Sequence, residues 1–321
     1  MLRNKHILIT GANGFLGRHL RKALLVTGAK VSHIVRSIVP SFHHDETQIA
    51  LDLTDRKKVK EIISTLQPNY VIHLAGTKER VNSGAQFFNS YERNVSISLN
   101  VIDACLDLPN FKRLVFLGSC DEYGQVPSPY DETQREMPSN AYGLSKLAVT
   151  KILSGLYQSC QFPSVVLRPT VIYGPNQGTE MFLSSLIQSL LAKKDFAMTL
   201  GEQFRDFLYV DDAVDAIIKA MNAGNQVDGK VVNIGAGVSC QVKKIACLVA
   251  NLIHPEAYTH LKLGAVQYRS HEVMNYAANI IRAEQLLGWK PKTQLEQGLQ
   301  RTIRDFASQI DSEMLGVNDY A

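Results

Sequence analysis

The chain has 321 residues, of which 45% are hydrophobic and 20% are charged, and this predicts a globular protein with a sizeable core and about two domains. Its net charge of +4 comes without a run of basic residues, so nucleic acid is not an expected partner. No window approaches the roughly 18 apolar residues of a membrane span, and the N-terminus lacks a signal-peptide pattern, so we expect a cytoplasmic protein without membrane contact. The five cysteines form no C-x-x-C pair, which argues against a disulfide framework and against a metal site.

A short β-strand is predicted over residues 5–10, and a glycine-rich turn separates it from a helical pattern. The turn reads Gly11-Ala-Asn-Gly14-Phe-Leu-Gly17. In a dinucleotide-binding unit the first glycine permits the tight turn, the second lets the backbone approach the pyrophosphate, and the third lets helix and strand pack closely. The alternative is a tight turn that binds nothing. The predicted cofactor contacts in this stretch are Gly11, Asn13, Gly14, Phe15, Leu16 and Gly17.

The second predicted strand, residues 31–35, ends in Val35-Arg36-Ser37. A site for NAD usually carries an Asp or Glu here, which accepts a hydrogen bond from the ribose 2′-hydroxyl. An arginine and a hydroxyl suit a 2′-phosphate instead, because a guanidinium binds phosphate through paired hydrogen bonds. The sequence therefore favours NADP(H), with NAD(H) possible if Arg36 is an ordinary solvated side chain.

Two further strands precede the middle of the chain, and both end in residues suited to a cofactor. Asp52 and Leu53 follow the third strand and are expected beside the adenine. The fourth strand ends in small residues, Ala75-Gly76, which would let the cofactor lie close, and His73 is interpreted as a satisfied core histidine. A helix is predicted over residues 94–105. The other expected cofactor contacts are Leu74, Ala75, Gly76, Lys78, Asn94 and Thr170.

A cluster of polar side chains follows the fifth predicted strand, residues 113–117. Doubly wound sheets bind ligands at the carboxyl ends of their strands. Ser119 would donate a hydrogen bond to a reacting oxygen, while Asp121 and Glu122 could be an acid, a base or partners of sugar hydroxyls. The alternative for Glu122 is a solvated loop carboxylate. Cys120 completes the cluster and is expected to contact the substrate with Glu122.

Tyr142 and Lys146 stand four positions apart in Asn140-Ala-Tyr-Gly-Leu-Ser-Lys146. On a helix this spacing puts both side chains on one face, so the ammonium of Lys146 can lie beside the phenol of Tyr142. A nearby positive charge favours the phenolate and lowers the pKa of the phenol toward neutral pH. The pair is therefore a candidate acid catalyst, although the same spacing also arises by chance. The candidate catalytic residues are Ser119, Asp121, Tyr142 and Lys146.

Strict alternation of strand and helix weakens after the sixth strand, which runs from Val165 toward Tyr173. An amphipathic helix is predicted over residues 182–191, a strand leading into a capped helix over residues 203–212, and another strand over residues 231–234. Arg205 and Arg269 are the cations expected on a diphosphate, because arginine binds it with paired hydrogen bonds. A surface ion pair is the alternative for each arginine. Asn176 is a further expected substrate contact.

This order of elements predicts an α/β fold in which a doubly wound parallel Rossmann sheet carries a smaller, discontinuous α+β substrate-binding domain. Residues 1–172, with a return segment of about 206–235, are expected to bind the dinucleotide. Residues 173–205 and 236–321 are expected to form the substrate-binding cap.

The glycine motif, the Ser119 strand end, Tyr142-x-x-x-Lys146, Arg168-Pro with Tyr173-Gly-Pro, and Arg205-Asp-Phe-x-Tyr-Val-Asp-Asp together resemble the extended short-chain dehydrogenase/reductase family, of the NAD-dependent epimerase/dehydratase type. The resemblance covers nearly the whole chain. It implies that Tyr142 is the general acid, that Lys146 also holds the nicotinamide ribose, and that Ser119 binds the reacting oxygen. It also implies nucleotide-diphosphate sugars as substrates and a homodimer as the assembly.

The last third of the chain indicates a branch of that family. Gly201-Glu-Gln-Phe-Arg-Asp-Phe, Gly235-Ala-Gly-Val-Ser, Leu263-Gly-Ala, His271-Glu-Val-Met and Leu287-Gly-Trp-Lys-Pro291 are most similar to the CDP-abequose synthase type of reductase. The resemblance implies NADPH-dependent reduction of a nucleotide-diphosphate 4-keto-6-deoxyhexose at C4. A dehydratase is less favoured, because Cys120 and Asp121 stand where that branch carries an acid or serine followed by Glu. A 4-epimerase stays open, and a cofactor-binding regulator without turnover is disfavoured by the intact Ser119, Tyr142 and Lys146.

Overall fold

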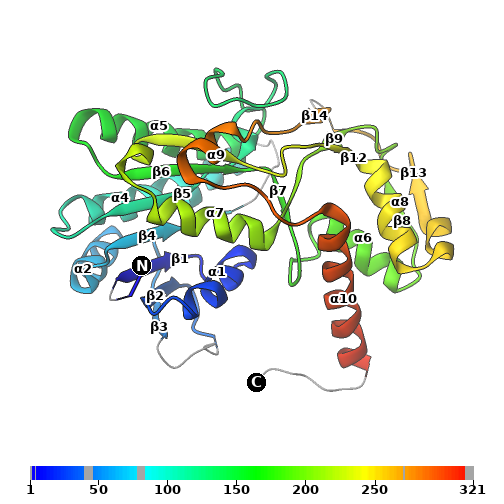
Figure 1. The fold of residues 1–321 in the computed structure, drawn as a ribbon, viewed down its shortest axis with the longest axis horizontal. Helices are drawn as coiled ribbons and strands as arrows, with labels where there is room; N and C mark the ends of the chain where they lie inside the picture. Colours follow the sequence, from blue (N-terminus) through cyan, green and yellow to red (C-terminus); the bar gives the residue numbers. More distant parts are fainter. Residues whose placement is uncertain (1, 4, 40–45, 78–83, 270–271, 315–321) are drawn as a thin grey trace.

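The computed structural model describes residues 2–3, 5–39, 46–77, 84–269 and 272–314. Its centre is a parallel sheet of seven strands in the order β11-β6-β5-β4-β1-β2-β3 (Figure 1). The strand order reverses between β1 and β4, and the carboxyl ends at this point form the usual ligand crevice of a doubly wound sheet. The strands are β1 (His6–Thr10), β2 (Lys30–Val35), β3 (Glu46–Ala50), β4 (Tyr70–His73), β5 (Arg113–Leu117), β6 (Ser164–Pro169) and β11 (Lys230–Ile234). The predicted Rossmann-type α/β fold is confirmed.

Helices cover both faces of this sheet, and the alternation of side chains along the strands explains how. Ile7 and Ile9 of β1 share a core with Leu20 of α1, while Leu8 between them shares a second core with Val101 of α4. Side chains along a strand alternate between the two faces of a sheet. Figure 1 shows α1 (Phe15–Leu25) and α7 (Val210–Asn222) near one another, with α2 (Arg56–Leu66), α4 (Ile97–Leu106) and α5 (Ala141–Cys160) grouped apart from them.

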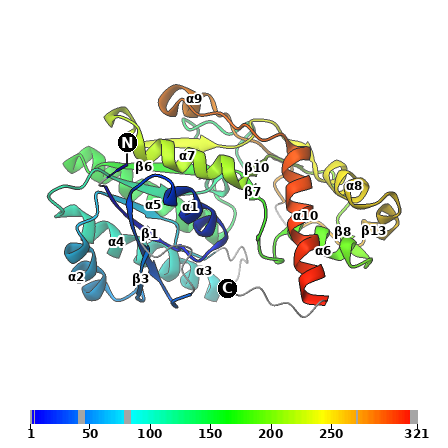
Figure 2. The ribbon, with the colours of Figure 1, turned by 60° about the horizontal axis from the view of Figure 1, so that its bottom comes forward.

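A second, smaller lobe lies beside the carboxyl ends of the strands. Figures 1 and 2 both show α6, α8, α10, β8 and β13 together on one side of the molecule. These elements are α6 (Phe182–Leu191), α8 (Val242–Ile253), α10 (Leu295–Met314), β8 (Phe196–Met198) and β13 (Leu261–Leu263). The helix predicted over residues 182–191 is therefore confirmed. The division of the chain at residue 172 stays a prediction, and no helix of the described residues is long and apolar enough to cross a membrane.

Further short elements lie outside the central sheet. They are β7 (Val171–Tyr173) with β10 (Phe207–Tyr209), the small sheet of β9 (Phe204–Arg205), β12 (Cys240–Gln241) and β14 (Asn275–Tyr276), the helix α9 (Ile281–Leu287), and the turns η3 (Asn225–Val227) and η4 (Pro255–His260). The strand leading into a capped helix, predicted over residues 203–212, is confirmed in its order, since α7 begins at Val210. The strand itself is divided at Asp206 into β9 and β10, and the side chain of Tyr209, which precedes α7, makes no capping hydrogen bond. The buried Asp206 carboxylate accepts hydrogen bonds from Thr170 Oγ1 at 3.0 Å and from the amides of Ala236 and Gly237 at 2.7 and 3.1 Å.

The helix predicted over residues 94–105 begins earlier than expected. A helical segment, α3 (Gly84–Ser90), leads into a π-helical turn, η1 (Tyr91–Ser96), which continues directly as α4. Isolated π-helical turns are uncommon and often occur at functional sites. Asn94 lies in this turn.

Candidate active site

Residues of both lobes line a cleft of about 1800 Å³ above the carboxyl ends of the strands. It runs from the glycine turn and the end of β2, past β4, β5 and the first turn of α5, to β8 and β9 of the smaller lobe. The predicted site residues that line it are Gly11, Asn13, Gly14, Phe15, Leu16, Gly17, Arg36, Asp52, Leu53, Leu74, Ala75, Gly76, Ser119, Tyr142, Thr170, Arg205 and Arg269.

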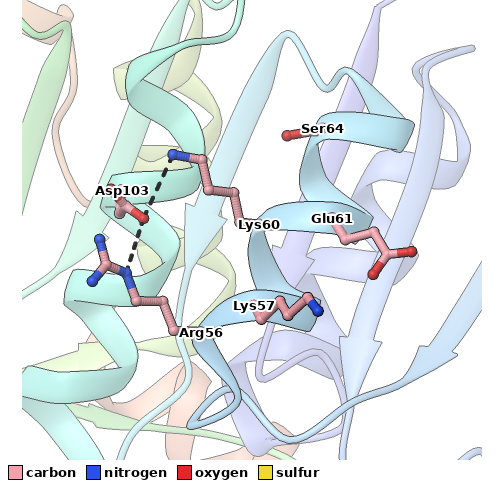
Figure 3. Close-up of a pocket in the computed structure, with 6 residues that line it drawn as sticks. All are labelled: Arg56, Lys57, Lys60, Glu61, Ser64 and Asp103. Atoms are coloured by element: carbon pink, nitrogen blue, oxygen red, sulfur yellow. Dashed lines mark hydrogen bonds and ion pairs between the residues drawn. The ribbon is translucent and has the colours of Figure 1, made fainter.

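Figure 3 shows another cavity, of about 500 Å³, on α2 and α4. Arg56 and Lys60 of α2 both approach the carboxylate of Asp103, at 3.2 and 3.8 Å. None of the predicted site residues lines this cavity, and its charged side chains interact with each other along the helix surfaces. We therefore place the functional site in the large cleft.

The glycine turn has the geometry that a dinucleotide requires. Gly11 has φ +73, and a side chain there would bring its Cβ within 2.7 Å of the Ala75 amide nitrogen. A Cβ at Gly17 would lie 2.4 Å from the Gly11 carbonyl oxygen. Helix α1 begins after Gly14, and none of the described side chains caps this end. A close backbone approach beside a helix N-terminus fits a pyrophosphate.

The end of β2 carries the predicted cofactor-selecting residue. Arg36 is exposed and lines the cleft together with Ser37. The side-chain amide of Asn13 donates to the Ser37 carbonyl at 3.0 Å and accepts from the buried Arg21 at 3.2 Å, so the glycine turn is tied to this segment. Asp52 also lines the cleft, and its carboxylate accepts a hydrogen bond from the Thr54 amide at 2.9 Å. This hydrogen bond lowers the pKa of the Asp52 carboxyl.

The wall beyond β4 is held by buried hydrogen bonds. Asn94 accepts from the Thr77 amide at 2.8 Å and lies behind the cleft wall. The ring nitrogens of His73 meet Thr10 Oγ1 at 2.6 Å and Ser98 Oγ at 2.9 Å, and burial lowers the pKa of His73 to about 3. His73 is therefore a satisfied core histidine, as predicted. Lys78, also predicted here, lies outside the described residues.

The candidate catalytic side chains meet where β5 ends and α5 begins. Ser119 follows β5 and caps the short turn η2 (Cys120–Glu122), and its Oγ accepts from the Asp121 amide at 3.0 Å. Asn140 caps α5, so Tyr142 stands in the first helical turn. Lys146 Nζ lies 5.9 Å from the Tyr142 ring centroid and donates to the Leu117 carbonyl at 2.8 Å.

Lys146 is buried in this arrangement. Burial lowers its pKa to about 8, and the negative charge of Glu122 opposes that shift. A lysine with a pKa close to neutral still carries its charge at pH 7 and can favour the phenolate of a neighbouring tyrosine. The helical spacing of Tyr142 and Lys146 thus brings the phenol at the cleft wall close to a buried ammonium.

Besides Asn94 and Lys146, four predicted site residues lie away from the cleft wall. The Cys120 thiol donates to the Arg168 carbonyl at 3.3 Å, and burial raises its pKa. Glu122 is also fully buried and binds Arg168, so neither side chain is placed to contact a substrate. Asn176 binds Asp305 of α10 through its backbone amide at 2.8 Å. Asp121 is half-buried beside Ser119 but does not line the cleft.

The two predicted diphosphate ligands lie toward the smaller lobe. Arg205 forms an ion pair with Glu272 and lies 5.7 Å from the Tyr276 ring centroid, while Arg269 is exposed. Both arginines line the cleft, so the ion pair and a ligand-binding role coexist at Arg205. The sequence did not single out other residues of this wall, because they come together from β8 and from loops distant in the chain. These residues include Phe196, Met198, Thr199, Gln203, Val266, Gln267 and Glu272.

Comparisons with known proteins agree with this geometry. The model of the NAD dependent epimerase/dehydratase family matches residues 7–235. A Bacillus subtilis (strain 168) protein named an uncharacterized UDP-glucose epimerase is 28% identical over 96% of this chain and 99% of its own length. The CDP-abequose synthase of Salmonella typhimurium (strain LT2) is 24% identical over 94% of this chain and 98% of its own. A solved structure of UDP-glucose 4-epimerase with UDP-glucose, from Thermotoga maritima, has a TM-score of 0.87 at 25% identity, covering 95% of this chain and 99% of that one. The chain belongs to the NAD dependent epimerase/dehydratase family, that is, to the extended short-chain dehydrogenases.

Proposed function

We propose that the protein is an NADPH-dependent reductase of a nucleotide-diphosphate 4-keto-6-deoxyhexose. The observation that carries the proposal is the placement of Ser119 and Tyr142 on the cleft wall with the Lys146 ammonium buried beside the phenol. A near full-length match to a CDP-abequose synthase, at 24% identity, is compatible with this branch. The substrate class and the direction of the reaction are proposals.

Each residue has a role in reducing C4. The glycine turn would hold the pyrophosphate of NADPH, which would supply the hydride for the C4 ketone when bound. Ser119 donates a hydrogen bond to the ketone oxygen, and Tyr142 gives that oxygen its proton as negative charge develops there. The ammonium of Lys146 would stabilise negative charge on the Tyr142 oxygen and would hold the nicotinamide ribose.

The cofactor preference rests on Arg36. A guanidinium at the end of β2 can bind a 2′-phosphate, and the residue before it is Val35 instead of a carboxylate. Ser37 lies next to Arg36 on the cleft wall and offers a hydroxyl to the same phosphate. These two residues favour NADPH, although the family as a whole is named for NAD.

The sugar nucleotide is proposed to lie toward the smaller lobe, with its diphosphate on Arg205 and Arg269. Glu272 already pairs with Arg205, so the carboxylate fixes the guanidinium and reduces the positive charge available to the diphosphate. A diphosphate carries two or more negative charges and therefore needs the exposed Arg269 as a second cation.

A nucleotide-diphosphate sugar 4-epimerase is the second candidate. The similarity to a UDP-glucose 4-epimerase structure with a TM-score of 0.87 favours it. An epimerase would retain its nicotinamide and return the hydride to the opposite face of the same sugar. A 4,6-dehydratase is a weaker candidate, because the buried Cys120 thiol occupies the position where that branch carries an acid or a serine.

We also propose that the protein is a homodimer. Exposed apolar side chains gather on elements that pack together, α3, η1, α4 and α5, and they include Phe88, Tyr91, Leu99 and Leu144. Exposed apolar side chains that gather on neighbouring elements are typical of an interaction site. Sedimentation equilibrium tests the proposal, and a monomer at micromolar concentration would contradict it.

The function is tested by incubating the purified protein with NADPH and a panel of nucleotide-diphosphate 4-keto-6-deoxysugars, followed at the nicotinamide absorbance. We expect one NADPH consumed per ketosugar reduced, and protein that is purified largely free of nicotinamide. Mass spectrometry of the denatured protein provides the second readout. Stoichiometric bound NAD, with UDP-sugar interconversion and no net NADPH consumption, would establish the epimerase instead.

A further inference from the structure

A buried carboxylate lies directly behind the proposed catalytic residues. Glu122 closes the turn η2, and its Oε1 accepts from the Ser119 amide at 2.9 Å while Ser119 Oγ accepts from the Asp121 amide. This reciprocal arrangement is a capping box, which fixes the residue at its start. Glu122 therefore holds the backbone that presents the Ser119 hydroxyl to the cleft.

The strand end is shaped to admit this carboxylate. A Cβ at Gly118 would lie 2.4 Å from Glu122 Oε1, so glycine leaves the space that the carboxylate fills. On the other side of the same strand end, Leu117 accepts the hydrogen bond of Lys146. Glu122 and Lys146 thus bind main-chain groups two residues apart, Ser119 and Leu117.

Arg168 of β6 lies against the Glu122 carboxylate and favours its ionised form. Arg168 Nε donates to Glu122 Oε2 at 2.8 Å, and Nη2 lies 2.7 Å from the same oxygen. Burial raises the pKa of Glu122, but Arg168 and the Ser119 amide oppose that shift. A guanidinium stays protonated in proteins, so burying it without a carboxylate anion would leave its charge uncompensated.

A second carboxylate, Glu136, joins Arg168 to an exposed lysine at the protein surface. Arg168 Nη2 also donates to Glu136 Oε1 at 2.7 Å, and the exposed Lys151 binds Glu136 at 2.8 Å. Glu136 is therefore neutralised from two sides. Glu122 instead contacts one cation, Arg168, directly. Its negative charge also acts on a second cation, Lys146: it raises the pKa of Lys146, whereas burial lowers that pKa.

We propose that Glu122 is a positioning residue of the active site, whose buried carboxylate both fixes Ser119 and keeps the Lys146 ammonium charged beside Tyr142. This inference rests on the proposed function for its catalytic consequence. The titratable groups around Lys146 are Tyr142 on its own helix, His73 at the end of β4, Asp121 and Glu122 on η2, and Arg168 on β6 behind Glu122. His73 stays neutral at working pH, since its pKa is about 3.

The test is Glu122→Gln, which keeps an oxygen for the Ser119 amide and removes the charge. Lysine labelled with ¹³C at Cε reports the titration of Lys146 directly, and the Lys146→Met protein assigns the signal by its loss. We expect the pKa of Lys146 to fall by about one unit in Glu122→Gln, because removing a nearby opposite charge disfavours the ammonium. Glu136→Gln is the matched control and should shift it far less, because Lys151 and Arg168 both neutralise Glu136.

This titration needs no substrate, so it separates failure of the inference from failure of the proposed function. Where the reductase assay works, the alkaline limb of the pH profile of kcat/KM should move to lower pH in Glu122→Gln. An unchanged Lys146 titration, or an equal fall in Glu136→Gln, would overturn the inference. So would a rate loss that is uniform across pH, which is the signature of a purely structural role.

Glu122→Asp covers the case in which Glu122→Gln does not fold. The shorter side chain keeps the charge near Arg168 but retracts from the Ser119 amide. We expect a Lys146 titration close to that of the wild type and a lower kcat, since Ser119 is less well fixed. A fall in the pKa of Lys146 as large as one unit in this charge-conserving variant would contradict the inference.

Discussion

The side-chain amide of Asn94 donates a hydrogen bond to the hydroxyl of Ser145 at 2.8 Å, and that hydroxyl donates to the main-chain oxygen of Tyr142 at 2.8 Å. The π-helical turn η1 is thereby joined to the helix that carries the proposed acid. The other end of the same amide accepts from the Thr77 amide, which lies on the cleft wall. One buried side chain thus connects the cofactor wall to the catalytic helix.

Asn94→Ala should weaken both connections. The half-buried Thr77 amide would lose its acceptor, at a cost of about 1–3 kcal/mol if it is left unsatisfied, while the Ser145 hydroxyl would lose one of its two hydrogen bonds and keep the one to Tyr142. We expect a lower free energy of unfolding in urea and weaker cofactor binding measured by fluorescence titration. The control is Asn222→Ala at the exposed end of α7, which should change stability by less than about 0.5 kcal/mol. Equal stability of the two variants would contradict the structural role of Asn94.

Tyr142→Phe keeps the aromatic ring and removes the proton that the mechanism requires. Loss of a general acid should lower turnover by about 10²–10⁴ while the protein stays folded by circular dichroism. Tyr157→Phe is the matched control, because Tyr157 lies on the same helix α5 and does not line the cleft. Near wild-type turnover in Tyr142→Phe would mean that another group supplies the proton, and Asp121 would be examined next.

Arg36→Asp tests the choice of cofactor. The substitution removes the guanidinium proposed for the 2′-phosphate and introduces the carboxylate that suits the ribose of NAD. One lost charge-assisted contact is worth about 1.5–3 kcal/mol, or roughly tenfold to a hundredfold in NADPH affinity. Arg56→Asp on α2 changes the net charge equally but lies outside the large cleft, so it should leave both affinities unchanged. Wild-type protein that binds NADPH and NADH equally would refute the preference.

Much of the site could be predicted because short-range patterns determine it. The glycine turn needs a particular backbone, so Gly11, Gly14 and Gly17 identify it from the sequence. The four-residue spacing on a helix brings Lys146 beside Tyr142 wherever the helix lies, and the carboxyl end of a parallel strand brings Ser119 to the cleft.

Other features depend on contacts between distant residues, and the sequence pattern does not contain these contacts. Glu122 follows a strand end, which is where a ligand-binding carboxylate is expected. Its side chain is instead buried, where it binds Arg168, 46 positions later in the chain. Similarly, Asn176 is engaged by Asp305 of α10. The strand predicted ahead of the helix in residues 203–212 is interrupted at Asp206, whose carboxylate binds the amides of Ala236 and Gly237, and no local propensity indicates these contacts.

The neutral, buried His73 should make the protein sensitive to acid. Its pKa is about 3 in the folded state and about 6.5 when unfolded, so between these values the unfolded chain binds a proton that the folded chain does not. The stability contributed by neutral His73 is therefore present above about pH 6.5 and is lost as the pH falls toward 3. The contribution to the slope is at most about 1.4 kcal/mol per pH unit.

His73→Gln separates the contribution of His73 to the pH dependence of stability from that of other acid-sensitive groups. One of these groups is His33, and burial lowers its pKa to about 4. The variant should be less stable at pH 8, because Thr10 and Ser98 lose the imidazole that joins them. Between pH 6.5 and 5, however, its free energy of unfolding should fall less steeply than that of the wild type. Urea unfolding at pH 8, 6.5, 5.75 and 5 measures both effects. If the wild type and the variant lose stability in parallel over this range, the unfolded and folded pKa values of His73 do not differ, and the pH dependence arises elsewhere.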